Sequence, residues 1–316
     1  PILKGKGACE QCRIKLALLG ETPGSADQGS LDANPFSVVL RLGEEVVVFQ
    51  QEARHEPMRF GLDGVFRGLV GRIGSGPGEF SFPNVGLVDV GDSLHIFDAL
   101  DARVSVFSPH MTLVRTASLP LSVYRAVRLS NGQYIVSGTR ATREGFGFPF
   151  HSLDKKGRYL RSFGVVRPVI GPGILPIRYA IAASSRRGAI WAVPEHETEG
   201  EYYTVTLFDS LGSGLLNIRR EDRALERARR PLFLMSRPPP AMVYGLFEES
   251  ADTLWIYTFV PGTEWKTAYA PSTQTGEGAT TVTIKSFDGL WDTMIDVIDA
   301  RRGRLIASTI VPQLLG

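Results

Sequence analysis

Hydrophobic and polar residues alternate along most of the chain, in short runs that end at glycine, aspartate or asparagine. Such period-two alternation is typical of β-strands that bury one face. The runs predict five groups of four strands, which we expect over 36–70, 85–118, 123–163, 177–218 and 242–310. A helix is expected only at 220–230 (REDRALERARR), because Pro231 and the prolines at 238–240 end that run.

The groups share one order of features. The stretches 92–120, 132–164 and 188–219 each contain a tight turn, an apolar strand, a variable polar loop, a second strand and a final strand after another tight turn. A repeat of roughly 40 to 50 residues with four strands is typical of β-propeller blades. We therefore predict an all-β fold, a β-propeller of four-stranded blades, with five complete blades and an incomplete sixth that closes the ring.

The incomplete blade raises the question of how the ring closes. The run RIKLALL (13–19) is the candidate closing strand, and only VPQLLG (311–316) follows the fifth group. Either further residues complete the blade, or its strands come from another copy of the chain, since an unpaired strand edge is a template for a second chain. We expect residues 1–12 to form an N-terminal extension and 13–316 a single propeller domain.

Charge and hydropathy limit the classes of partner. Thirty-five Lys and Arg residues stand against 33 Asp and Glu residues, for a formal net charge of +2. A balance this even does not predict a nucleic-acid surface. The interleaved acids of 220–230 favour pairing within the predicted helix over a basic stripe. No apolar run reaches the roughly 18 residues that span a bilayer, so no transmembrane segment is expected.

Two cysteines, Cys9 and Cys12, are the only ones in the chain. Two thiols are too few for a four-thiolate zinc site, and Arg13 occupies the position where haem attachment requires histidine. We predict a structural disulfide, which indicates an extracytoplasmic location: periplasm, cell surface or secreted. A first residue that is proline rather than methionine fits the removal of a signal segment.

The glycine-rich stretch GRIGSGPGEFSFPN (71–84) suggests either a phosphate-binding loop or a connection between blades. A P-loop requires Lys-Ser/Thr after its last glycine, and a dinucleotide-binding loop must begin a helix; neither follows here. Pro77 also removes a backbone N–H that a phosphate would need. We therefore expect the glycines to serve a connection that needs positive φ angles.

The stretch 71–108 resembles an NHL repeat. The matching residues are Gly74, Gly76, Gly78, Glu79, Phe80, Pro83, Asp98, Asp101, Arg103, Val104, Val106 and Phe107. The whole chain is similar to bacterial exported six-bladed propellers of this type, whose activities are mostly uncharacterised. The resemblance implies a structural role for the two aspartates, which accept backbone hydrogen bonds in such turns, and for Arg103, which pairs with them.

Propeller ligands usually bind at one mouth of the central channel. Candidates there are Arg125 and Arg178 on innermost strands, as an anion site or as core ion pairs. Glu195, His196 and Glu197 offer either a divalent-cation site, with calcium as the candidate ion, or a solvated acidic loop. The five histidines are scattered among different groups, and no G-x-S-x-G elbow offers a nucleophile.

Two classes of function remain. The first is a module that binds a protein or glycan, or assembles with copies of itself, without cofactor or catalysis. The second is an enzyme with its site at the channel mouth: a metal-dependent hydrolase resembling lactonase propellers, or a lyase resembling the NHL-type peptidylglycine enzyme. Those enzymes need axial metal ligands, and Asp89 is the only carboxylate expected on an inner strand before the fifth group. The sequence therefore favours the binding module.

Overall fold

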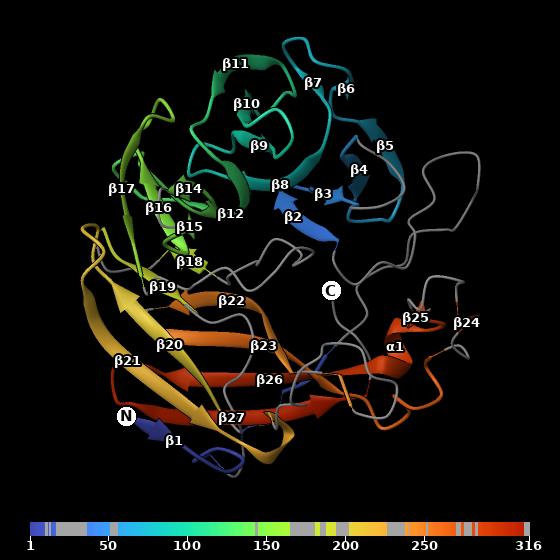
Figure 1. The fold of residues 1–316 in the computed structure, drawn as a ribbon, viewed down its shortest axis with the longest axis vertical. Helices are drawn as coiled ribbons and strands as arrows, with labels where there is room; N and C mark the ends of the chain where they lie inside the picture. Colours follow the sequence, from blue (N-terminus) through green and yellow to red (C-terminus); the bar gives the residue numbers. More distant parts are fainter. Residues whose placement is uncertain are drawn as a thin grey trace. The chain divides into compact units, whose positions relative to one another are not determined.

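The computed structural model of the chain is built almost entirely from β-strands. The residues that it describes are 1–9, 12, 14–16, 37–50, 56–142, 145–164, 181–183, 188–193, 202–225, 238–239, 241–250, 252–269, 273–274, 280–281 and 284–312. These residues form five four-stranded antiparallel blades in a β-propeller arrangement, which confirms the predicted fold class (Figure 1). Among them, no helix is long and apolar enough to cross a membrane.

The chain divides into two compact units. One comprises Leu16–Arg178 and Ser210–Ser213, and contains three blades. Blade 1 is β2 (Val38–Leu42), β3 (Glu45–Phe49), β4 (Met58–Gly61) and β5 (Phe66–Leu69). Blade 2 is β8 (Pro83–Val88), β9 (Leu94–Asp98), β10 (Arg103–Phe107) and β11 (Leu113–Ser118). Blade 3 is β12 (Ser122–Arg128), β13 (Tyr134–Thr139), β16 (Phe150–Leu153) and β17 (Tyr159–Phe163).

The first strands of these three blades lie next to one another. β8 packs against β2 on one side and against β12 on the other (Figure 1). Apolar side chains fill the space between consecutive blades: Phe49, Phe80 and Ile96 belong to one buried cluster, and Phe97 and Val136 to the next. Alternation along each strand supplies these residues, because every second side chain points to the same face.

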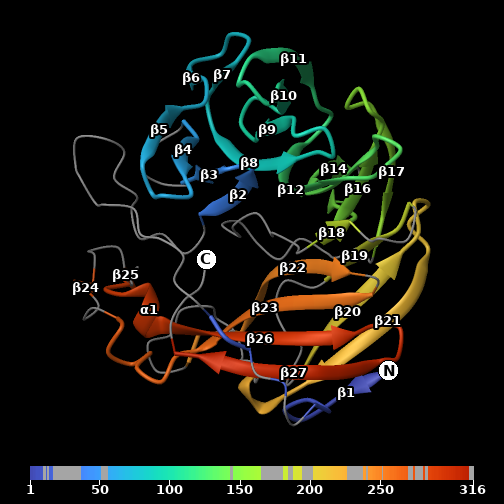
Figure 2. The same cartoon turned by 180° about the vertical axis from the view of Figure 1, so that it is seen from behind.

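The second unit comprises Pro1–Lys15, Tyr179–Asp209 and Gly214–Leu315, and contains two blades. Blade 4 is β18 (Ile181–Ala183), β19 (Ile190–Ala192), β20 (Tyr202–Phe208) and β21 (Gly214–Glu221), and β1 (Ile2–Leu3) joins it in parallel at the outer edge of β21. Blade 5 is β22 (Met242–Ser250), β23 (Thr253–Pro261), β26 (Trp291–Asp299) and β27 (Arg304–Val311). Their first strands, β18 and β22, also pack together, and Figure 2 shows the blades from behind.

Short strands and one helical turn are present in addition to the five blades. Three two-residue strand pairs flank them: β6 (Arg72–Ile73) with β7 (Glu79–Phe80), β14 (Ala141–Thr142) with β15 (Gly145–Phe146), and β24 (Thr273–Gln274) with β25 (Thr280–Thr281). The single α-helical turn described is α1 (Phe287–Leu290), which the Ser286 hydroxyl caps by accepting from the backbone N–H of Gly289.

Two sequence-based expectations are wrong in the part of the chain that is described. The helix expected at 220–230 is absent from its first half: Arg220 and Glu221 end β21, and Arg223–Leu225 forms one 3₁₀ turn. The reason is that Arg220 pairs with residues far away in sequence rather than with its helical neighbours. Ile14, Lys15 and Leu16 of the expected closing strand lie outside any strand; the N-terminal residues that do pair are Ile2 and Leu3.

Candidate functional site

The glycine-rich loop surrounds a side chain rather than offering a phosphate site. The Arg103 guanidinium donates to the carbonyl oxygens of Ser75 at 2.6 Å and Gly74 at 3.2 Å, and also to that of Glu79. A loop whose carbonyl oxygens converge on a guanidinium is arranged to hold a cation. The geometry accordingly favours the architectural interpretation of 71–84 over a nucleotide cradle.

Asp98 links this loop to the β9–β10 turn. Its carboxylate accepts from the backbone N–H groups of Ser81 at 2.7 Å and Phe82 at 3.1 Å, and from two further N–H groups in its own turn, those of Leu100 and Asp101. Arg103 lies 2.9 Å from the carboxylate of Asp101. The carboxylate oxygens of Asp98 therefore already accept their hydrogen bonds from the fold itself.

A polar network joins the C-terminal ends of β8 and β12. Asp89, directly after β8, accepts from Arg128 at the end of β12, and its Oδ2 lies 3.1 Å from Nε2 of His95. Nδ1 of His95 is 2.8 Å from the hydroxyl of Tyr134, which accepts from Arg115 at 2.9 Å. With Nε2–H as the donor to Asp89, Nδ1 accepts from Tyr134; with the other tautomer, Nε2 accepts from Arg128, whose Nη1 lies 3.1 Å away, and Nδ1–H donates to Tyr134.

The centre of this network, His95 and Tyr134, is shielded from solvent, whereas Asp89 and Arg128 are partly exposed. His95 is 1% exposed, and burial, with the nearby Arg128 charge, lowers its pKa from 6.5 to about 4. Burial, the largest single influence, raises the pKa of Asp89, but hydrogen bonds from the backbone N–H groups of Ser93 and Gly91 and the interaction with His95 together lower it. The inner-strand carboxylate that sequence analysis singled out is thus bound to Arg128 and His95.

The contacts at both ends align β8 with β12. At the N-terminal ends, the Ser122 hydroxyl donates to the carbonyl of Ala99 at 2.8 Å, and the Ala99 N–H donates to the carbonyl of Phe82 at 3.1 Å. Because the N-terminal ends of β8 and β12 lie together and their C-terminal ends lie together, the two strands run side by side in the same direction. Residues near the start of β8 and near the start of β12 therefore lie at the same level.

Both strands carry a β-bulge at that level. In β8 the pairing with β9 shifts between Pro83 and Val85, so Asn84 is the extra residue. In β12 the pairing with β13 shifts between Val123 and Arg125, so Tyr124 is the extra residue. Bulges redirect a side chain and occur often beside functional sites. In the other unit, β22 has the same shift at Tyr244.

The bulge of β8 holds a buried amide that lacks hydrogen bonds. Asn84 is 1% exposed, and neither its Oδ1 nor its Nδ2 has a hydrogen-bond partner among the residues that the structure describes. The hydroxyl of Ser137, buried on β13 directly opposite Arg125, also lacks one. Leaving buried polar groups unsatisfied costs about 1–3 kcal/mol each, so such groups point to a ligand or ordered water. We define Asn84, Tyr124, Arg125 and Ser137 as the inner-strand site.

Of the residues singled out by sequence, Arg125 alone belongs to this site. It lies half-buried on β12, and one of its guanidinium nitrogens donates to the carbonyl of Tyr124 at 3.3 Å. Arg178, Glu195, His196 and Glu197 lie outside the described residues. Sequence analysis missed Asn84, Tyr124 and Ser137, although the similar stretches SVYRA (122–126) and MVYGL (242–246) place tyrosine at the bulge in two blades.

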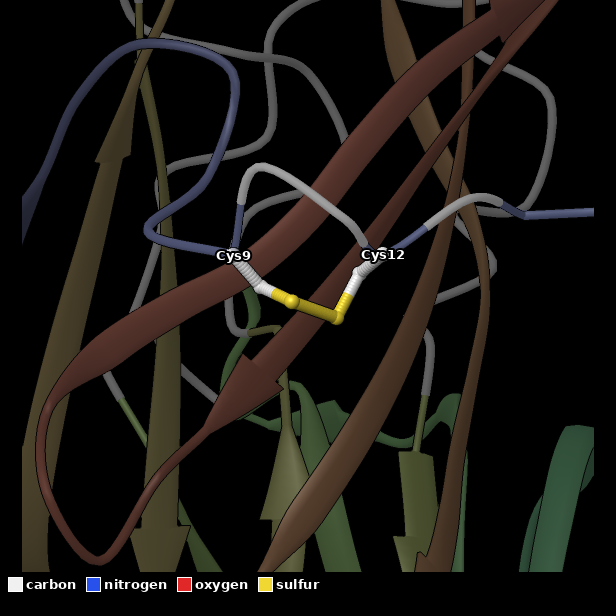
Figure 3. Close-up of a disulfide and its surroundings, with 2 residues drawn as sticks. All are labelled: Cys9 and Cys12. Atoms are coloured by element: carbon white, nitrogen blue, oxygen red, sulfur yellow. A yellow bond between two sulfur atoms is a disulfide. The ribbon is translucent and has the colours of Figure 1, made fainter.

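Cys9 and Cys12 form the predicted disulfide. Figure 3 shows the bond between them, with an S–S distance of 2.03 Å. Within the described part of the chain, no group of three or more His, Cys, Asp and Glu side chains is placed to hold a metal ion.

Comparisons with known proteins identify the fold. No protein-family model matches the chain, and no curated protein matches it in sequence. Among solved structures it is similar to a protein from Bacteroides fragilis named "Putative exported protein", with 11% identity, a TM-score of 0.57, and coverage of 92% of this chain and 79% of that one. It is also similar to a member of the DUF4221 family from Bacteroides vulgatus, with 9% identity, a TM-score of 0.58, and coverage of 92% and 84%. At such identities the likeness concerns the fold alone.

Proposed function

We propose that this protein is an extracytoplasmic β-propeller that acts as a binding module, with ligand recognition at the inner-strand site. The observation that carries the proposal is the buried amide of Asn84, whose donor and acceptor atoms both lack a partner among the described residues. The Cys9–Cys12 disulfide and the exported designation of a structural neighbour support the location. The NHL-type identity, a single propeller domain over 13–316 and closure by a sixth blade belong to the same proposal and rest on the sequence resemblance.

The chemistry of the inner-strand site favours a ligand that carries a carboxylate. Arg125 supplies a planar cationic donor, the group that binds carboxylates best in proteins. Asn84 can both donate and accept, and Ser137 adds a hydroxyl. Acidic glycans and the C-termini of proteins both carry a carboxylate.

Calorimetry with paired probes tests the proposal. An oligosaccharide of glucuronate is compared with its neutral glucose counterpart, and a peptide with a free C-terminus with the same peptide amidated. Asn84→Leu and Arg125→Gln should each weaken binding of the carboxylate probe at least about tenfold, equivalent to about 1.4 kcal/mol. Arg161→Gln, on the outer strand β17 of the same blade, is the matched control and should bind normally.

The outcomes separate the sources of the ligand. Binding of the glucuronate probe alone identifies an acidic glycan, and binding of the free peptide alone identifies a protein C-terminus. The proposal is wrong if neither carboxylate probe binds, if the neutral partners bind equally well, or if Arg161→Gln weakens binding as much as Arg125→Gln.

A further inference from the structure

The first nine residues run along the outer edges of two blades. Ile2 and Leu3 pair in parallel with Arg219 and Arg220 of β21, and the backbone N–H of Arg219 donates to the carbonyl of Pro1 at 2.9 Å. Figures 1 and 2 show β1 at this edge. We name residues 1–9 the strap.

The strap then crosses to blade 5. The N–H of Ser308 donates to the carbonyl of Lys6 at 3.1 Å, and the N–H groups of Ala8 and Cys9 donate to the carbonyls of Leu305 at 2.8 Å and Ile306 at 3.3 Å. The strap therefore covers the outer edge of β21 with its first half and that of β27 with its second. Uncovered edges of this kind attract other strands.

Close contacts hold the middle of the strap. The carbonyl of Gly5 accepts from Nη2 of Arg220 at 3.0 Å. Gly7 has a positive φ of 110°, and a Cβ built on it would lie 2.5 Å from the carbonyl oxygen of Ile306. The strap thus needs glycine at this position to lie against β27.

The disulfide lies where the strap leaves β27. Of the described residues, Cys9 is the last along the strap to make a backbone hydrogen bond to that strand, and the N–H of Cys12 donates back to the carbonyl of Cys9 at 3.2 Å. The bond between Cys9 and Cys12 closes this turn (Figure 3). A segment bound at a sheet edge opens from its ends, so a cross-link at the exit restricts the conformations of the opened strap.

We propose that the Cys9–Cys12 disulfide is a redox latch that keeps the strap on the edges of β21 and β27. A dithiol reductant opens it by thiol–disulfide exchange: a thiolate attacks one sulfur, and the second thiol releases the mixed disulfide. The S–S bond of the protein breaks, each of its sulfurs gains one electron and one proton, and the reductant becomes a disulfide. Reduction frees the turn, and the strap leaves both strand edges more often.

Hydrogen–deuterium exchange of the intact protein tests the latch, with and without dithiothreitol. The amides of Arg219 and Ser308 report on the two halves of the strap, because each donates to a strap carbonyl. Reduction should speed their exchange several-fold, up to the roughly twentyfold that chain entropy allows for a four-residue loop. The amide of Leu119, which donates to the carbonyl of Ala102 at 2.6 Å in the other unit, is the control and should not change.

The double variant Cys9→Ser, Cys12→Ser supplies the second arm. Its Arg219 and Ser308 amides should exchange at the fast rate in either condition, since dithiothreitol has no bond to break. Equal exchange in the oxidised and reduced wild-type protein contradicts the latch. An equal acceleration at Leu119 contradicts it as well, because reduction would then loosen the whole fold rather than the strap.

Discussion

Arg220 and Asp296 form an ion pair in which neither side chain is exposed to solvent, with Nε of Arg220 3.2 Å from both carboxylate oxygens. Arg220 lies on the outer strand of blade 4 and Asp296 on the third strand of blade 5, so the pair joins the two blades of its unit. Burial raises the pKa of Asp296, and the neighbouring Arg220 opposes that shift. The Tyr203 hydroxyl donates to the same carboxylate at 2.9 Å.

Breaking this pair should be costly. Arg220→Met leaves the buried Asp296 carboxylate without its cation and should lower the free energy of unfolding by about 3–5 kcal/mol. Asp296→Leu should cost less, because Arg220 keeps the Asp222 carboxylate at 2.9 Å. The double variant removes both charges. Its loss of unfolding free energy should be smaller than the sum of the losses in the two single variants by at least about 2 kcal/mol. Urea unfolding of the four proteins measures the coupling; additive losses would mean that the two residues do not stabilise one another.

The pair also shows where sequence reasoning fails. Local spacing in REDRALERARR predicts a helix, because Glu226 has arginines three residues before it and three and four residues after it, at positions 223, 229 and 230. Asp296, the partner that decides the conformation of Arg220, lies 76 residues further on. By contrast, strands such as Arg103–Phe107 were predicted to the residue, because alternation is a local property.

The inner-strand site was predictable only in part. Arg125 was identified because it is a charge on an expected first strand, but the role of Asn84 depends on a bulge in the pairing of β8 with β9. A bulge is a relation between two strands, and one strand's alternation does not reveal it. Strand β1 was missed for a simpler reason: two residues are too few to show a period.

Buried histidines predict a loss of stability in mild acid. Burial is the first cause that lowers the pKa values of His95 and His151 from 6.5 to about 4. Between these values the unfolded chain binds more protons than the folded one, so stability is fully present above pH 6.5 and falls as the pH drops towards 4. Over that pH range, each histidine contributes roughly 3 kcal/mol to the loss of unfolding free energy. Unfolding free energies of wild type and His95→Gln from pH 4.5 to 7.5 should show a shallower slope in the variant; equal slopes would exclude His95 as a source.

The carbonyl oxygens of the glycine-rich loop (71–84) that accept from Arg103 should require an arginine at that position. Arg103→Lys keeps the charge but replaces two forked nitrogens, which together bond four carbonyl oxygens, with one nitrogen that has three donors, and should lower the free energy of unfolding by about 2–3 kcal/mol. Arg72→Lys is the matched control on the same loop, since the exposed Arg72 side chain binds the Glu79 carboxylate and no carbonyl oxygen of the described residues; it should cost well under about 1 kcal/mol. Chemical denaturation compares them, and similar losses would argue against that requirement.

Close packing of the strap predicts a difference between two glycines. Gly5 and Gly7 both have positive φ angles, but a Cβ at Gly5 meets nothing within 4 Å, whereas one at Gly7 meets the backbone of β27. Gly5→Ala should cost about 1–2 kcal/mol from backbone strain alone, and Gly7→Ala clearly more. Thermal unfolding under oxidising conditions measures both, and equal losses would show that the strap does not lie tightly on β27.

The central claim is that the inner-strand site binds a carboxylate through Asn84, and the side-chain amide of that residue reports on it directly. In protein labelled with ¹⁵N-asparagine, the NH₂ signal that disappears in Asn84→Leu is assigned to Asn84, and is followed during titration with glucuronate and with glucose. The account predicts a saturable shift of this signal with glucuronate, none with glucose, and no shift with glucuronate in Arg125→Gln. A signal that stays in place throughout the glucuronate titration, or that moves equally with glucose, would contradict it.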